Sequence, residues 1–274
     1  MRMRLDLLLL QRGIFPSREK ARAAIMAGLV LVDGKRADKP SAPVKPEAAI
    51  EVREGPRPYV SRGGIKLKKA LEEFSIDLNQ RLVLDVGCST GGFTDCALQQ
   101  GAARVLAVDV GYGQLAWSLR QDPRVKLYER TNIRHLTREE LGEPAEVAVI
   151  DVSFISLSLV LPVVKGLLND QGQVVALIKP QFEAGRGRVV KRGVVRDPLV
   201  HREVIARVVQ AAADSGMTFK ALTYSPLLGP EGNIEYLIHL QKLPPGDTAV
   251  QSPAGIAEVI EKVVDRAHRD LRKV

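Results

Sequence analysis

The stretch Leu82-Val-Leu-Asp-Val-Gly-Cys-Ser-Thr-Gly-Gly92 decides the fold class of this chain. It begins with an apolar run of the length of a buried strand, and residues 92–100 that follow have the pattern of a helix. Three glycines, Gly87, Gly91 and Gly92, occupy the turn between them. Because glycine has no side chain, such a turn lets the backbone come close to a bound ligand. The stretch therefore predicts a strand–turn–helix unit of an α/β sheet, with a ligand site at the turn.

The same alternation continues on the C-terminal side. Apolar runs alternate with amphipathic segments, as in a mostly parallel sheet that is covered on both faces. We expect seven strands, near residues 82–86, 104–109, 125–129, 146–151, 173–178, 218–225 and 234–240. Helices are expected near 92–100, 113–121, 156–168 and 199–215. No helix separates the last two strands, so these should be antiparallel. The layout resembles the α/β, Rossmann-like fold of S-adenosylmethionine-dependent methyltransferases.

The residues around the glycine-rich turn indicate its ligand. Asp85 ends the first strand, and Asp109 ends the next apolar strand 24 residues later. A carboxylate at the second position can accept hydrogen bonds from ribose hydroxyls, and one at the first can contact a cationic amino-acid group. The spacing Gly87-x-Ser-x-Gly91-Gly92 departs from the dinucleotide motif, so S-adenosylmethionine is favoured over NAD or a purely structural turn. The predicted cofactor-binding residues are Asp85, Gly87, Ser89, Gly91, Gly92, Phe93, Asp109 and Asn132.

Charge is unevenly distributed along the chain. The formal net charge is +8, and residues 1–60 hold 12 Lys and Arg against 7 Asp and Glu. This favours a polyanionic partner, because Lys and Arg neutralise phosphates; a basic surface without a partner is the alternative.

Cys88 and Cys96 have neither the number nor the spacing of a zinc site, so no metal is expected. No apolar segment approaches the roughly 20 residues that span a bilayer, and we expect a cytoplasmic protein without a membrane partner.

The N-terminal part has the pattern of a small α+β module. Leu5, Leu8 and Leu9 lie at helical spacing and predict a first helix, and Ser17 is placed to cap a second one. Residues 29–32 predict a strand, and the dipeptide Asp33-Gly34 predicts a tight hairpin turn. Residues 50–52 are expected to form the last strand of the module.

The second helix and the hairpin carry a more specific pattern. The run Ser17-Arg-Glu-Lys-Ala-Arg22 is followed by Ile25, Gly28, Val30, Val32, Asp33 and Gly34. In this order the residues resemble the RNA-binding domain named after ribosomal protein S-four, which implies that basic side chains face structured RNA. A helical hairpin whose Arg and Lys side chains are merely solvated is the alternative. The RNA-binding residues that we predict over the whole chain are Arg4, Arg18, Lys20, Arg22, Lys35, Arg62, Arg186 and Arg188.

One short motif is misleading. Arg4-Leu5-Asp6 is similar to a catalytic motif of pseudouridine synthases, but these residues begin the first helix, where we expect Asp6 to be an exposed first-turn carboxylate.

Two prolines and a glycine in residues 53–60 indicate a short, stiff linker. The predicted organisation is an RNA-binding domain at 1–52, this linker, a catalytic domain at 61–242, and a C-terminal linker and helix at 243–274.

The residues at the predicted strand ends indicate which atom is modified. Methyltransferases of exocyclic amines carry Asn/Asp-Pro-Pro-Tyr/Phe after strand four, which this chain lacks, and no cysteine lies there for C5 methylation. Charged side chains lie instead before the first strand, at the ends of strands four and five, and at the start of the last strand: Lys66, Asp151, Lys179 and Glu235. In order they match the Lys-Asp-Lys-Glu tetrad of the FtsJ-type ribose 2′-O-methyltransferases.

With the N-terminal module, the chain to about residue 242 resembles the TlyA family, whose members also carry the name haemolysin. The match includes Ser-Arg-x-x-x-Lys-Leu from Ser61, Lys179-Pro-Gln-Phe-Glu183 and Asn233-x-Glu-Tyr236. The glycine-rich turn departs from FtsJ proper at Asp85 and Cys88-Ser-Thr90. The resemblance implies methyl transfer from S-adenosylmethionine to a ribose 2′-hydroxyl, with cytidine as the nucleoside and ribosomal RNA or ribosomal subunits as the partner.

The resemblance also implies roles for the tetrad. Lys179 would be the base or the group that orients the hydroxyl, while Asp151 and Glu235 would position the lysines and balance their charge. Residues 183–198 hold five basic residues and three glycines; we expect a loop that closes over RNA, or else an unstructured surface loop. A catalytically silent RNA-binding protein, a membrane-lytic protein and a small-molecule methyltransferase are the alternative functions.

Overall fold

The computed structural model describes residues 2–26, 28–53, 58–185, 193–243 and 252–271. The chain divides into two compact units, Met1–Arg57 and Pro58–Val274, and each unit is described on its own. Residues 186–192 of the predicted basic loop, with Arg186 and Arg188, lie outside the described residues.

The smaller unit packs two helices against short strands. Helices α1 (Leu5–Gln11) and α2 (Arg18–Met26) accompany an antiparallel sheet in the order β3 (Lys35–Arg36), β2 (Val30–Val32) and β5 (Ile50–Val52), and β1 (Met3–Arg4) pairs with β4 (Pro43–Val44). Its core consists of Leu5, Leu9, Ala21, Ala24, Ile25 and Val30. Asp33 and Gly34 have φ angles of 50° and 76°, the left-handed pair that a two-residue hairpin turn requires.

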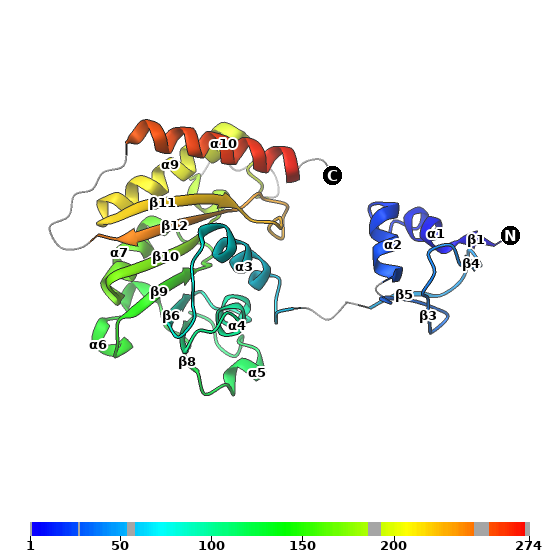
Figure 1. Ribbon diagram of the computed structural model, residues 1–274, viewed down its shortest axis with the longest axis horizontal. Coiled ribbons are helices and arrows are strands. Elements are labelled where there is room, and N and C mark those ends of the chain that lie inside the picture. Colours follow the sequence, from blue (N-terminus) through cyan, green and yellow to red (C-terminus); the bar gives the residue numbers. More distant parts are fainter. Residues whose placement is uncertain (1, 27, 54–57, 186–192, 244–251, 272–274) are drawn as a thin grey trace. The chain divides into compact units, whose positions relative to one another are not determined.

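The larger unit is built on a seven-stranded sheet (Figure 1). In spatial order its strands are β11 (Met217–Tyr224), β12 (Tyr236–Lys242), β10 (Leu168–Ile178), β9 (Ala145–Ile150), β6 (Leu82–Val86), β7 (Arg104–Val108) and β8 (Val125–Tyr128). The strands from β10 to β8 are parallel, and β12 is antiparallel to both β10 and β11. The predicted fold class, a Rossmann-like methyltransferase sheet, is confirmed.

Helices cover both faces of this sheet, because alternate strand residues such as Val83 and Leu84 point to opposite sides. One apolar cluster joins the strands to α3 (Gly63–Phe74), α4 (Gly92–Gln99) and α5 (Trp117–Arg120). The other cluster joins them to η1 (Ile133–His135), α6 (Arg138–Leu141), α7 (Leu157–Leu167), α9 (Pro198–Asp214) and α10 (Pro253–Leu271). The short helix α8 (Pro180–Glu183) follows β10. In folds of this kind the ligand binds at the carboxyl edge of the parallel strands.

Several elements differ from the prediction. Helices α6 and α8 were not expected, and β12 begins at Tyr236 instead of residue 234. Three other differences have a clear cause. Helix α3 is absent from the predicted set, because two glycines begin it and hide the helical spacing of its apolar residues. The expected helix at 113–121 shrinks to α5, since Gly113 has a φ of 70° and Leu115 is buried in the preceding loop. Strand β10 begins before the expected residue 173, with a register shift between Leu168 and Gln173.

Candidate active site

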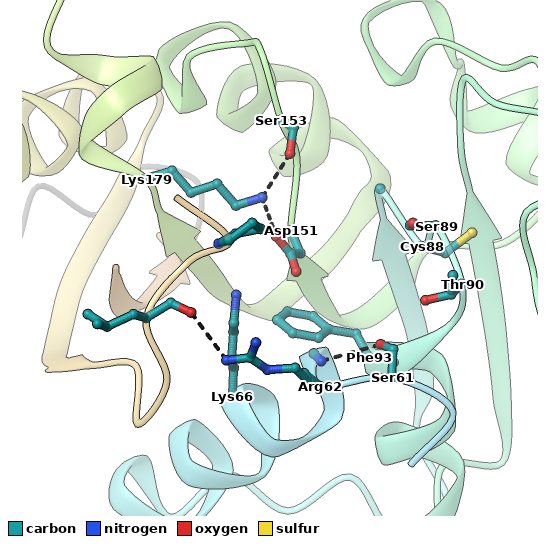
Figure 2. A pocket seen from close by; sticks show the side chains of 15 residues that line it. Ser61, Arg62, Lys66, Cys88, Ser89, Thr90, Phe93, Asp151, Ser153 and Lys179 are labelled. Atoms are coloured by element: carbon teal, nitrogen blue, oxygen red, sulfur yellow. Dashed lines mark hydrogen bonds and ion pairs between the residues drawn. The ribbon is translucent and has the colours of Figure 1, made fainter. Parts of the chain in front are cut away.

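A cavity of about 260 Å³ lies at the carboxyl edge of the parallel strands. The glycine-rich turn after β6, the start of α3, and the ends of β9 and β10 form most of its wall (Figure 2). The loop between β11 and β12 closes the remaining side. The lining residues are Ser61, Arg62, Gly63, Lys66, Gly87, Cys88, Ser89, Thr90, Gly92, Phe93, Asp151, Ser153, Lys179, Leu228 and Pro230.

Two ion pairs join the four charged residues predicted from the sequence. Lys66 Nζ lies 2.5 Å from Glu235 Oε2, and Lys179 Nζ lies 2.6 Å from Asp151 Oδ1. Asp151 and Lys179 directly follow the parallel strands β9 and β10, and Glu235 directly precedes the antiparallel strand β12. An antiparallel strand begins at the edge where its parallel neighbours end, so the sheet brings the three together. Helix α3 adds Lys66 from outside the sheet.

Both ion pairs are largely removed from water. Only 1% of the Glu235 side chain and 12% of the Lys66 side chain are exposed. Burial raises the pKa of Glu235, and the neighbouring Lys66 ammonium opposes that shift. A buried carboxylate is costly unless it is paired, which explains why Glu235 and Lys66 lie so close. Glu235 does not line the cavity; it contacts Lys66, which does.

Lys179 has a second oxygen partner that the sequence patterns did not single out. Its Nζ donates a hydrogen bond of 2.9 Å to Ser153 Oγ. Figure 2 shows the Lys179 amine between Asp151 and Ser153. Ser153 is exposed and lines the cavity. The only signal in the sequence is its position, two residues after the carboxylate that ends β9.

The glycine-rich turn has the geometry of a ligand cradle. Gly87 has a φ of 83°, and a Cβ at this position would lie 2.7 Å from the backbone oxygen of Asp151. Gly91 also has a positive φ, of 96°, at the start of α4. Four of the predicted cofactor residues line the cavity, namely Gly87, Ser89, Gly92 and Phe93; four do not, namely Asp85, Gly91, Asp109 and Asn132.

Asp85 is fully buried beneath this turn. Its Oδ2 accepts a hydrogen bond of 2.6 Å from the Thr94 hydroxyl, while its Oδ1 is buried without a hydrogen-bond partner. Burial raises the pKa of Asp85 to about 7, and the Thr94 hydrogen bond opposes that shift. A buried oxygen without a partner is uncommon and points to a ligand or a functional role.

The other two polar residues predicted for the cofactor already make local contacts. Asp109 accepts hydrogen bonds from the backbone N–H groups of Ser89 and Gly111 at 2.8 and 2.7 Å, which ties the glycine-rich turn to the end of β7. Each carboxylate oxygen keeps a second acceptor position. Asn132 accepts from the backbone N–H of Arg134 and begins η1.

An exposed aromatic ring stands beside the tetrad. Phe154 is 89% exposed and packs against Phe182 with a ring-centroid distance of 4.8 Å. Its φ of 63° is a strained value for a residue with a side chain. Strain of this kind is kept where the surrounding structure enforces it, and it is concentrated at functional sites.

The prediction for Asp6 was wrong. Asp6 is fully buried, and it accepts hydrogen bonds from Arg4 at 3.1 and 3.0 Å and from Arg18 at 2.9 Å. These guanidinium groups hold the pKa of Asp6 at about 2. Arg4 is a sequence neighbour of Asp6, but the pattern of a first-turn carboxylate did not reveal Arg18, which the packing of the second helix brings to it.

The other predicted RNA-binding residues lie at the surface. Lys20, Arg22 and Lys35 are exposed on the smaller unit. Arg62 is exposed at the cavity, where its guanidinium donates over 3.5 Å to the backbone oxygen of Leu228. Within the described part of the chain, no group of three or more His, Cys, Asp and Glu could hold a metal ion. Among the described residues, no helix has the length and apolar character needed to cross a bilayer.

Comparison with known proteins identifies both units. The chain matches the FtsJ-like methyltransferase family over residues 59–242 and the S4 domain over residues 3–50. It is 50% identical to YqxC of Bacillus subtilis, provisionally named an rRNA methyltransferase, over 98% of this chain and 95% of that protein. It is 47% identical to the 16S/23S rRNA (cytidine-2′-O)-methyltransferase TlyA of Mycobacterium tuberculosis, over 88% of this chain and 90% of TlyA.

A solved structure extends the similarity to three dimensions. A Streptococcus thermophilus protein, provisionally named a hemolysin, superposes with a TM-score of 0.76 at 43% identity, covering 99% of this chain and 98% of that one. The chain therefore belongs to the FtsJ-like methyltransferase family and, with its N-terminal S4 domain, to the TlyA group within it.

Proposed function

We propose that this protein transfers a methyl group from S-adenosylmethionine to a ribose 2′-hydroxyl of ribosomal RNA, with cytidine as the nucleoside. One observation carries the proposal: two partly buried ion pairs, Lys66–Glu235 and Lys179–Asp151, meet at one cavity beside the glycine-rich turn. The S4 domain supports an RNA substrate. The activity for which TlyA is named supports the nucleoside and the acceptor atom, because this relative matches most of the chain.

The cradle fits the proposed cofactor. The partnerless Oδ1 of Asp85 suits a cationic group, and Gly87 leaves room that a Cβ would fill. We assign Asp85 to the charged amino-acid end and Asp109 to the ribose hydroxyls, for which its oxygens keep free acceptor positions. When bound, S-adenosylmethionine supplies an electrophilic methyl group carried on a sulfonium.

The acceptor side of the reaction falls to Lys179. A ribose hydroxyl is a weak nucleophile while it holds its proton, so a base or an orienting group next to it speeds the attack. Lys179 Nζ would receive or direct that proton, and Asp151 would hold Nζ in place and balance its charge. Lys66, held by its ion pair with Glu235, would line another side of the cavity. The hydroxyl must be aligned for in-line displacement, and this alignment supplies a large part of the rate.

The substrate side of the cavity offers contacts for a nucleotide. Arg62 is exposed at its rim and can pair with a phosphate. Phe154 presents an exposed ring next to Asp151 and Ser153, and unstacked bases in RNA commonly stack on such rings. Arg62 and Phe154 come from segments that also carry tetrad residues. A nucleotide bound to both would therefore have its ribose at a fixed position with respect to Lys179.

The test compares Lys179→Ala with the wild type and with Lys220→Ala, a control that removes an exposed lysine on β11 outside the cavity. Methylation of ribosomal subunits should fall roughly 100- to 10,000-fold in Lys179→Ala and stay unchanged in Lys220→Ala. Both variants should bind S-adenosylmethionine normally in calorimetry. Mass spectrometry of nucleosides should find the methyl on ribose; a methyl on a base, or full activity in Lys179→Ala, would overturn the proposal.

A further inference from the structure

Lys179 is held by two oxygen atoms that come from one short segment. Asp151 Oδ1 lies 2.6 Å from Nζ, and Ser153 Oγ accepts a hydrogen bond from it at 2.9 Å (Figure 2). The two oxygens differ in kind: one belongs to a carboxylate that balances charge, and the other to a neutral hydroxyl. Charge balance therefore explains Asp151 but leaves the contact with Ser153 to be explained.

The segment that carries Ser153 is fixed to the segment that carries Lys179. Glu183, at the end of α8, accepts hydrogen bonds from the backbone N–H of Leu157 at 2.8 Å and from the Ser156 hydroxyl at 2.6 Å. This carboxylate thus caps α7 and joins the chain after β9 to the chain after β10. Packing of Phe154 on Phe182 forms a second link between the two segments. Although Ser153 is exposed, it is not on a free loop.

The geometry of an amine nitrogen explains the hydrogen bond between Lys179 Nζ and Ser153 Oγ. Nζ has four tetrahedral directions, one of which is its bond to Cε. The ion pair with Asp151 is not aligned as a hydrogen bond, because Asp151 Oδ1 has no hydrogen-bond partner, so with Asp151 alone Nζ could rotate about the Cε–Nζ bond. The hydrogen bond to Ser153 Oγ occupies one direction of Nζ and stops this rotation. Lys179 lines the cavity, so a direction that is left open can face the substrate. That direction carries a lone pair in the neutral amine and an N–H in the ammonium form.

We propose that Ser153 is a positioning residue for the methyl transfer: its hydroxyl fixes the rotation of Lys179 Nζ, so that the remaining direction points at the substrate hydroxyl. The inference rests on the proposed function and goes beyond the tetrad, which alone leaves that rotation undetermined. Ser153 acts through Lys179. Its loss should lower the rate of the chemical step and leave the binding of both substrates unchanged.

The experiment measures single-turnover methylation of ribosomal subunits by Ser153→Ala at saturating S-adenosylmethionine. We expect the rate constant to fall between roughly 10- and 100-fold, the size of effect that misplacement of a reacting group produces. The KM for the subunits, the affinity for S-adenosylmethionine and the unfolding midpoint should match the wild type. Ser153→Thr keeps a hydroxyl on Cβ and should restore most of the rate. Ser118→Ala, which changes an exposed serine on α5 outside the cavity lining, is the control and should behave as the wild type.

The outcomes separate this inference from the proposed function. A wild type that methylates ribose, together with Ser153→Ala at the wild-type rate, would overturn the role of Ser153 and leave the function standing. A raised KM with an unchanged rate constant would also overturn it, because Ser153 would then bind the substrate. A Ser153→Thr variant as slow as Ser153→Ala would overturn it too, since the shape of the side chain, and not its hydroxyl, would then matter. A wild type that places no methyl on ribose would refute the proposed function itself.

Discussion

Replacing Lys66 by methionine tests the electrostatics of the site through stability. The variant keeps the length of the side chain and removes the ammonium that lies 2.5 Å from Glu235 Oε2. Breaking a buried ion pair from one side costs about 3–5 kcal/mol, because the other charge stays buried without a partner. Since Glu235 is 1% exposed but Lys66 keeps 12% of its side chain exposed, we expect the lower end of this range, about 3 kcal/mol at neutral pH.

The sign of the pH dependence follows from the shift of the Glu235 carboxyl. Burial raises its pKa in the folded protein, and Lys66 opposes that shift, so Lys66→Met should raise the pKa further. A group whose folded pKa lies above its unfolded value favours the folded state in acid and loses that contribution as pH rises through the folded pKa. The cost of Lys66→Met should therefore be small in acid, where Glu235 is protonated, and largest at neutral and higher pH.

Urea unfolding followed by circular dichroism at several pH values can measure this. Lys66→Met with Glu235→Gln should recover much of the loss, because no buried charge then lacks a partner. Lys68→Met is the matched control on the same helix: its ion pair with Glu72 is exposed, at 47% and 64%, and should contribute only about 0.3–0.5 kcal/mol. A cost for Lys66→Met that is no larger than this control, or that is equal at all pH values, would refute the reasoning.

Three further predictions concern the cofactor, the last helix and RNA. Affinity for S-adenosylmethionine should fall as pH drops below about 7, where Asp85 gains a proton, and calorimetry on Asp85→Asn should show weak binding with no such dependence. His268→Ala should lower the unfolding midpoint, because His268 on α10 lies 3.0 Å from the buried His201; an unchanged midpoint would contradict this. Lys20→Ala with Arg22→Ala should weaken RNA binding, and the slope of its salt dependence should fall by about 1 for each phosphate that is no longer neutralised, as measured by filter binding.

The sequence predicted the sheet well because the relevant signals are local. Most of the parallel strands are short apolar runs bounded by polar residues. The glycines of the turn after β6 are typical of a strand–turn–helix unit that binds a ligand. The helical signal in α3 was also local, but it was overlooked because glycines begin that helix. Strand ends were the least certain part: Glu235 was expected to start the last strand and instead precedes it.

Side-chain partners could not be predicted in the same way. Lys66 and Glu235 were both expected at the site, but nothing in the sequence pairs one lysine with one carboxylate across 169 positions. The burial of Asp6 depends on Arg18, which comes from another helix. Ser153 is one small polar residue among many, and its contact with Lys179 appears only once β9 and β10 lie side by side.

The position of β12 has a consequence for how the enzyme is made. β12 lies between β10 and β11, although the ribosome synthesises it after both. Because β11 pairs only with β12, it has no strand partner until β12 emerges, and during this time the β12 side of β10 is an unpaired edge of the kind that promotes aggregation. Glu235 arrives with β12. Addition of β12 therefore completes both the sheet and the tetrad, so a chain still being translated through this region has neither a finished sheet nor a finished active site.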